Sequence, residues 1–169
     1  MKHFTTRSSL GIVALFFLVS LGPITSVPST DQDWPEYHGD AARSHYSPLD
    51  QIAPENLSRL KIAWTYTSGG ADTLGNRTQI QCNPIIIKGR LYGVSAHTQA
   101  FALDAATGKE LWKTHLADNG GTTSRGVTYW SDGRDERIFF GAGRWLYALN
   151  AHTGRPVDSF GTNGRIDLK

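Results

Sequence analysis

Short hydrophobic runs rich in Val, Ile, Tyr and Trp alternate with Gly, Asn and Asp through most of the chain, and no long run has helical periodicity. This alternation predicts successive antiparallel strands, so we expect an all-β fold. One stretch, Ala53 to Leu60, is expected to be helical, since Pro54 suits a first helical turn. The expected strands are Leu60 to Thr67, Asn83 to Lys88, Arg90 to Ser95, Gln99 to Asp104, Glu110 to His115, Val127 to Trp130, Arg137 to Ala142 and Trp145 to Asn150.

The N-terminal segment has the pattern of a signal peptide. Lys2 and Arg7 precede an almost wholly apolar run of 12 residues, Leu10 to Leu21, which Gly22 and Pro23 follow. As a helix that run would rise only about 18 Å, which is short for a hydrocarbon layer of about 30 Å, so a retained anchor is the less favoured alternative. We therefore expect residues 1–26 to direct export to the periplasm, residues 27–60 to form an extension, and residues 61–169 to form the folded repeats.

The folded part contains an internal repeat. Phe101 to Lys109 aligns without gaps with Tyr147 to Arg155 at an offset of 46 residues, and Trp64 precedes Trp112 by 48. A period of about 40 to 50 residues with four short strands is typical of a β-propeller blade. Since a closed propeller needs at least four blades and two units are present, we expect the first blades of an incomplete propeller.

Each repeat carries a turn signature. The first strand pair turns at Asp104, whose side chain can accept a hydrogen bond from its own turn, and Gly108 supplies a positive φ. The small Ala102 leaves room for a large ring, so Trp112 is expected to pack over a glycine peptide of the neighbouring blade. The alternative is that the tryptophans are ordinary core residues, and truncation would then cost the same, about 3 to 5 kcal/mol.

Composition and charge exclude several classes of function. The 169 residues include 17 Lys and Arg against 15 Asp and Glu, a formal net charge of +2 that falls to zero without Lys2 and Arg7. These charges are scattered, whereas a nucleic-acid-binding protein needs a clustered basic face. Cys82 is the single cysteine, so neither an internal disulfide nor a zinc motif is expected. Gly141 and Gly143 lack the third glycine and the helix of a dinucleotide-binding turn, so NAD is rejected.

The repeat resembles the tryptophan-docking motif of the pyrroloquinoline quinone (PQQ)-dependent dehydrogenases. In the second copy Asn150, Arg155 and Asp158 replace Asp, Lys and Trp, with Phe160 nearby as a substitute ring. An opening segment of the same family also matches, so the resemblance covers about Asp33 to Lys169. The motif residues are Ala102, Asp104, Thr107, Gly108, Lys109 and Trp112, and the matching opening residues are Trp34, Tyr37, His38, Gly39, Arg43, Tyr46, Ser47, Leu49, Ile52, Asn56, Leu57, Leu60, Ala63 and Trp64.

Three further stretches resemble the membrane-type quinoprotein glucose dehydrogenases within that family. They are Gln81-x-x-Pro84, Ala96-His97 and Ser124-Arg125-Gly126-Val127-Thr128-Tyr129. Gly120 to Thr123 stands where many alcohol-oxidising relatives carry a vicinal cysteine pair just before the Arg-Gly segment. This difference favours sugar-oxidising or uncharacterised branches over methanol- and ethanol-type enzymes.

The resemblance implies an eight-bladed propeller that holds PQQ, a planar tricarboxylated quinone, together with Ca²⁺. It assigns cofactor binding to Arg125 and Gln81 and substrate positioning to His97. A planar guanidinium suits a carboxylate or quinone oxygen, and an amide adds no charge repulsion, although an Arg in a Ser/Thr/Gly loop is more often solvated and a lone His is more often a turn residue. The Ca²⁺ ligands and the catalytic base are expected beyond Lys169, since Asp104 belongs to a turn and Asp118 to a polar loop.

The expected parent protein is an exported oxidoreductase that oxidises a sugar or an alcohol. It would pass electrons to ubiquinone or cytochrome c, with or without an association with the membrane. The alternative is a non-catalytic propeller of the outer-membrane assembly scaffold type, which shares the repeats but needs neither Arg125 nor Gln81. These 169 residues alone are expected to be inactive and to bind cofactor weakly, because their strand edges and half of a blade interface would be exposed.

Overall fold

The computed structural model describes residues 33–70, 72, 74–75, 79–116 and 123–169, all within the compact unit Asp31–Lys169. The expected signal peptide over residues 1–26 lies outside the described residues, as do Asp118 and most of the Gly120 to Thr123 stretch. The signal peptide and the extension over residues 27–60 therefore stay predictions.

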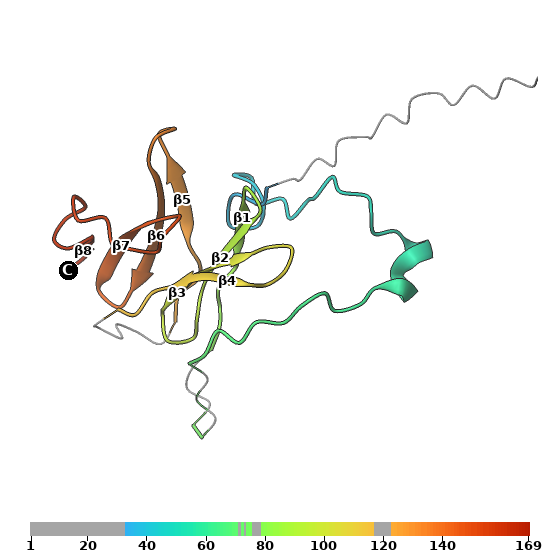
Figure 1. Cartoon of the computed structure of the whole chain (residues 1–169), viewed down its shortest axis with the longest axis horizontal. Coiled ribbons are helices and arrows are strands. Elements are labelled where there is room, and N and C mark those ends of the chain that lie inside the picture. Colours follow the sequence, from blue (N-terminus) through green and yellow to red (C-terminus); the bar gives the residue numbers. More distant parts are fainter. Residues whose placement is uncertain (1–32, 71, 73, 76–78, 117–122) are drawn as a thin grey trace, which may run out of the picture. The chain divides into compact units, whose positions relative to one another are not determined.

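The fold consists of two four-stranded antiparallel sheets, each with its strands in chain order (Figure 1). The prediction of an all-β fold is confirmed. The first sheet contains β1 (Ile85–Ile87), β2 (Arg90–Val94), β3 (Ala100–Asp104) and β4 (Glu110–Lys113), and the second contains β5 (Thr128–Ser131), β6 (Glu136–Ala142), β7 (Trp145–Asn150) and β8 (Arg165–Asp167).

The same turn chemistry closes the third strand of both sheets. In the first sheet, the carboxylate of Asp104 accepts hydrogen bonds from the main-chain N–H of Thr107 at 2.8 Å and from its hydroxyl at 2.7 Å. In the second sheet, the side-chain oxygen of Asn150 accepts from the N–H of Thr153 at 3.0 Å and from its hydroxyl at 3.1 Å. Asn therefore makes the same turn as Asp, because both side chains present an acceptor oxygen at this position.

One strand prediction was wrong, and one strand was not predicted. Residues 60–67 form no strand, although Ile62, Trp64 and Tyr66 alternate with the smaller or polar Lys61, Ala63 and Thr65. The main chain of residues 61–67 has no hydrogen bond to any other described segment. An alternating pattern forms a strand only where another strand pairs with it, and none of the described segments pairs with residues 61–67. Conversely, β8 was not predicted, since it holds the single apolar residue Ile166 and follows a loop of 14 residues after β7.

The expected helix is a 3₁₀ helix, η1 (Pro54–Arg59), with Pro54 in its first turn. The side-chain oxygen of Asn56 accepts a hydrogen bond from the N–H of Ala53 at 3.0 Å, and its amide donates to the carbonyl oxygen of Gln51 at 2.7 Å. Asn56 thus satisfies the main-chain N–H of Ala53, the N-cap residue, whose own side chain makes no capping hydrogen bond.

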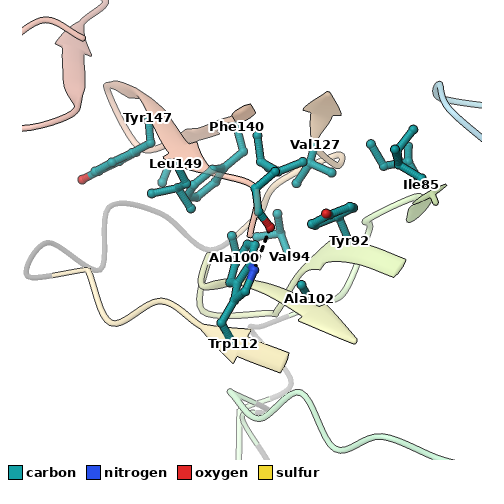
Figure 2. Close-up of a cluster of buried hydrophobic side chains, with 14 residues drawn as sticks. Ile85, Tyr92, Val94, Ala100, Ala102, Trp112, Val127, Phe140, Tyr147 and Leu149 are labelled. Carbon is teal, nitrogen blue, oxygen red and sulfur yellow. Dashed lines mark hydrogen bonds between the residues drawn. The ribbon is translucent and has the colours of Figure 1, made fainter. Parts of the chain in front are cut away.

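One hydrophobic core joins the two sheets (Figure 2). The first sheet contributes the face that carries Ala102 and Trp112, and the second contributes the face that carries Leu149. Leu149 is equivalent in the repeat to Leu103, which points to the opposite side of the first sheet from Ala102. The sheets therefore pack head to tail, and a head-to-tail contact repeats into a ring or a helix instead of closing as a dimer.

Candidate functional site

The segments that lead into β1 and β5 lie side by side, and they carry the two residues expected to bind cofactor. The main-chain N–H of Asn83 donates to the carbonyl oxygen of Arg125 at 3.0 Å, and Asn83 forms a parallel bridge with Gly126. A Cβ at Gly126 would lie 2.9 Å from the carbonyl oxygen of Asn83, and its φ of 148° also disfavours a side chain. The glycine thus allows the two lead-in segments to approach closely.

Arg125 is exposed, and among the residues that the structure describes its side chain has no hydrogen-bond or ion-pair partner. Gln81 lies two residues before Asn83, is half-buried and donates its amide to the side-chain oxygen of Gln79 at 3.1 Å. A guanidinium and an amide near one edge provide donors for carboxylate or carbonyl oxygens. This donor set fits a planar, carboxylate-bearing quinone.

His97 lies in the turn between β2 and β3, at the end of the first sheet where β1 begins, since Ile85 at the start of β1 pairs with Tyr92 near the end of β2. Its side chain is exposed, and a Cβ at Gly70 would lie 2.9 Å from its ring. The fold thus places His97 and Gln81 at the same end of one sheet. A role in positioning substrate stays a prediction.

The Cys82 thiol packs into the first sheet next to this edge. Its sulfur accepts a hydrogen bond from the N–H of Val94 at 3.2 Å, and burial raises the pKa of the thiol above its ordinary value. The charged thiolate is therefore disfavoured, and the residue contributes packing instead of a reactive nucleophile.

Trp112 connects the two sheets on the side away from the lead-in segments. Its Nε1 donates to the carbonyl oxygen of Ala151 at 2.9 Å, the dashed line at Trp112 in Figure 2. Its ring covers Gly154, where a Cβ would lie 2.5 Å from ring atoms. The ring is buried, and Ala102 lies opposite it on β3. The acceptor Ala151 and the covered Gly154 were not identified from sequence, although the offset of 46 from Ala105 and Gly108 could have found them.

The second repeat lacks an equivalent indole. Asp158, which stands at the tryptophan position, is exposed. The Phe160 ring makes an edge contact with Phe139 of its own sheet, with centroids 5.4 Å apart. Among the described residues, Phe160 therefore fills space within the second sheet.

A charged cluster joins the sheets at the end opposite to Arg125. Lys88, in the β1–β2 turn, lies 2.6 Å from the carboxylate of Glu136 at the start of β6, and His152 lies 3.2 Å from the other carboxylate oxygen. The hydrogen bond from Lys88 holds the pKa of Glu136 below its ordinary value. Glu136 is the most enclosed member, with a side chain 17% exposed.

Two other kinds of site are absent from the described part of the chain. There, no group of three or more His, Cys, Asp or Glu side chains is arranged to hold a metal ion. Over the same residues, no helix has the length and hydropathy to cross a bilayer.

Residues 34–169 match the PQQ family model described as the glucose/ethanol/alcohol dehydrogenase β-propeller domain. A similar curated protein is the alcohol dehydrogenase (quinone) dehydrogenase subunit of Gluconobacter oxydans, 39% identical over 148 residues, which cover 79% of this chain and 18% of that protein. Quinoprotein glucose dehydrogenase A of Acinetobacter calcoaceticus is 33% identical over 82% of this chain and 21% of its own length. The chain thus spans about a fifth of the relatives it matches.

Solved structures of similar proteins have the same fold. The quinohemoprotein alcohol dehydrogenase of Comamonas testosteroni matches with a TM-score of 0.60 at 28% identity, over 73% of this chain and 18% of that one. The quinohemoprotein alcohol dehydrogenase ADHIIG of Pseudomonas putida HK5 matches with a TM-score of 0.65 at 24% identity, over 82% of this chain and 19% of that one. Together with the family match, these likenesses identify the two sheets as consecutive blades of an incomplete β-propeller, as predicted.

Proposed function

This chain belongs to the PQQ-type glucose/ethanol/alcohol dehydrogenase β-propeller family, and we propose that it is the first part of a quinoprotein dehydrogenase that oxidises a sugar or an alcohol. The observation that carries the proposal is the contact between Asn83 and Arg125, which brings the two expected cofactor-binding segments together. The docking tryptophans do not require that contact, since Trp112 lies on β4, at the opposite edge of the first sheet from β1.

In this proposal Arg125 binds an anionic oxygen of PQQ, and Gln81 donates its amide to a neighbouring carboxylate. The exposure of Arg125 and its lack of a side-chain partner among the described residues leave its donors available to a ligand. The Arg fork can make two parallel hydrogen bonds to one carboxylate, which a lysine cannot do. When bound, the quinone supplies the acceptor for the two electrons that leave the substrate.

The close contact at Gly126 fixes where the Arg125 side chain begins. The carbonyl oxygen of Arg125 accepts a hydrogen bond from the N–H of Asn83, which holds the main chain of Arg125 in place. Little backbone conformational entropy is therefore lost when the guanidinium binds a ligand. His97 stands at the same end of the first blade and would contact the substrate hydroxyl groups. In the full protein the base and the Ca²⁺ ligands would come from other blades.

We further propose that the substrate is a sugar of the glucose type, with a simple alcohol as the second candidate. The Ala96-His97 and Arg-Gly-Val-x-Tyr stretches support the sugar, whereas relatives named as alcohol dehydrogenases and as glucose dehydrogenases both match the chain. Periplasmic location, and electron transfer to ubiquinone or a cytochrome, complete the proposal. A non-catalytic scaffold remains the competing function, since it would use the same docking repeats.

The proposal is tested by titrating the full-length gene product with PQQ in the presence of Ca²⁺. Glucose and ethanol are then added separately with an artificial electron acceptor. Saturable cofactor binding followed by acceptor reduction with either substrate supports the dehydrogenase, and the rates rank the two substrates. Failure to bind PQQ would favour the scaffold.

A further inference from the structure

The turn between β2 and β3 fixes the main chain of His97. The main-chain N–H of Ser95 donates to the carbonyl oxygen of Gln99 at 2.9 Å, and the Ser95 hydroxyl oxygen accepts from the N–H of Gln99 at 3.2 Å. Thr98 has a φ of 55°, is 1% exposed, and donates its hydroxyl to the carbonyl oxygen of His97 at 2.8 Å. With the main chain held on both sides, the position of the imidazole depends on the side-chain torsions χ1 and χ2 of His97.

Gly70 packs against the atoms that define χ1 of His97. A Cβ at Gly70 would lie 2.9 Å from the main-chain nitrogen of His97, 2.9 Å from its ring atom Cγ and 3.1 Å from its Cβ. All three atoms belong to the N–Cα–Cβ–Cγ torsion. Gly70 has a φ of 82°, which also disfavours a side chain. The main chain of Gly70 therefore closes off part of the space into which the imidazole could rotate.

The segment that leads to Gly70 is anchored along the first blade by every second residue. The indole N–H of Trp64 and the hydroxyl of Tyr66 donate hydrogen bonds to this blade at 3.1 and 2.6 Å. The carbonyl oxygen of Ser68, which is 8% exposed, accepts a hydrogen bond from the Lys113 ammonium of β4. Because the blade that holds these three residues also carries the β2–β3 turn, Gly70 and the turn keep a fixed relative position.

The imidazole of His97 is exposed at this end of the blade and has no hydrogen-bond or ion-pair partner among the described residues. A neutral imidazole has one donor and one acceptor nitrogen, and a hydroxyl group can meet either. A sugar of the glucose type carries hydroxyl groups away from the carbon that is oxidised, whereas ethanol carries only the hydroxyl that reacts. An imidazole held in one orientation can therefore favour the sugar through hydroxyl groups that ethanol lacks.

We propose that Gly70 is a positioning residue that sets specificity for a sugar over a simple alcohol. It holds χ1 of His97 so that the imidazole faces the hydroxyl groups of the sugar that lie away from the oxidised carbon. This inference rests on the proposed function, in which His97 contacts the substrate. It adds a residue that acts on the substrate through His97 alone.

Gly69 provides a matched control beside it. Its φ of 78° nearly equals that of Gly70, so an alanine at either position carries similar backbone strain. Among the described residues, a Cβ at Gly69 would meet the end of the Lys113 side chain, at 3.4 Å, and that side chain can rotate away. Gly70→Ala therefore differs from Gly69→Ala in its contact with His97.

Steady-state kinetics on the full-length gene product with PQQ and Ca²⁺ test the proposal. We expect Gly70→Ala to raise KM for glucose about 3- to 10-fold, the loss of one hydrogen bond between neutral groups, with kcat nearly unchanged. Its KM for ethanol should stay as in the unmodified protein, and Gly69→Ala should change neither value. Equal glucose KM values in the two variants, or an equal rise for ethanol, would overturn the proposal.

A second background separates positioning of the ring from a general disturbance of the turn. His97→Ala removes the ring but keeps the main-chain nitrogen and the Cβ that an alanine at position 70 would meet. In that background we expect Gly70→Ala to cause no further rise in the glucose KM, because there is no ring to orient. The same rise in both backgrounds would count against the proposal and leave only a structural role for Gly70.

A measurement on the unmodified full-length protein needs neither a variant at position 70 nor catalysis. Histidine labelled with ¹³C at Cε1 reports the mobility of the His97 ring, and its signal is assigned by its absence in His97→Ala. We expect an NMR order parameter of about 0.8, close to that of a rigid backbone. A value below about 0.6 would show a ring that is not held, and would overturn the proposal.

The failure of this inference is distinguishable from the failure of the proposed function. PQQ binding with oxidation of ethanol but not of glucose would overturn the specificity role of Gly70 and leave the dehydrogenase in place. Failure to bind PQQ would remove the proposed function, on which this inference depends.

Discussion

The indole N–H of Trp112 donates a hydrogen bond to the carbonyl oxygen of Ala151 at 2.9 Å, and this bond crosses the interface between the two blades. Trp64 makes the corresponding bond to Ala105 at 3.1 Å. The two bonds are equivalent in the two sequence repeats. Each indole N–H donates to a carbonyl oxygen of the same hairpin whose glycine its ring covers. Four predictions follow from this arrangement and from the site at the other end of the blades.

Truncation of Trp112 should destabilise the full-length protein by about 3 to 5 kcal/mol, because it removes a large buried ring. Trp112→Phe keeps most of the buried area but leaves the Ala151 carbonyl without its donor, and should cost about 1 to 2 kcal/mol. Denaturant unfolding measures both losses of free energy. Leu57→Ala, at an exposed residue, is the control, and its expected loss is near zero. No loss in the Phe variant would contradict a contribution from the hydrogen bond, and equal losses for the Phe and Ala variants would contradict a contribution from the buried ring.

Gly154→Ala should destabilise the protein more than Gly133→Ala. Both glycines have positive φ, 68° and 88°, so both variants carry backbone strain of about 1 to 2 kcal/mol. Only at Gly154 does the new methyl group meet Trp112, at 2.5 Å, whereas at Gly133 nothing lies within 4 Å. The difference in free energy of unfolding, about 1 to 3 kcal/mol, measures the blade contact alone, and a difference of zero would mean that the ring moves away freely.

Arg125→Lys should weaken PQQ binding by about tenfold or more, equivalent to about 1.4 kcal/mol, because a lysine cannot replace the two-pronged contact. Arg155→Lys is the matched control, since Arg155 is exposed on the docking hairpin at the other end of the blade. We expect the control to bind PQQ as the unmodified protein does. Equal affinity in all three proteins would remove Arg125 from the cofactor site.

Glu136→Gln should lower thermal stability at pH 7 and change it little at pH 3. The pKa of Glu136 lies below its ordinary value of 4.5, chiefly because Lys88 donates to the carboxylate, so the folded state favours the charged form. Its contribution is complete above pH 4.5 and is lost as the pH falls through the lower folded value. Unfolding midpoints of both proteins across pH 3 to 7 should converge on the acid side, and a constant difference would contradict the ion pair.

Most strands could be predicted because each carries its own apolar pattern and a turn signal at its end. The Lys88-Gly89 turn, with φ of 50° and 73°, and the Asp104 turn are local, so sequence alone locates them. The errors came from pairing, which is not local. Residues 60–67 have the alternating pattern of a strand but pair with no other segment that the structure describes. Strand β8 pairs with β7 although it contains only one apolar residue.

The candidate site was only partly predictable for a related reason. Arg125 and Gln81 carry distinctive side chains within a family motif, so resemblance could identify them. Asn83 contributes through its main-chain N–H and C=O, and any residue type has these groups, so no side-chain signal marks it. Gly126 gave the indirect clue, because a glycine in a motif often marks a close backbone approach.

In the proposed arrangement, these blades surround an axis and present Arg125 to a cofactor held there. A crystal structure of the full-length gene product with PQQ and Ca²⁺ would show whether they do. We predict that the guanidinium of Arg125 lies within hydrogen-bond distance of PQQ, with the Asn83–Gly126 contact next to the axis. A structure with Arg125 on the outer rim, or with the blades stacked in a line, would contradict the account.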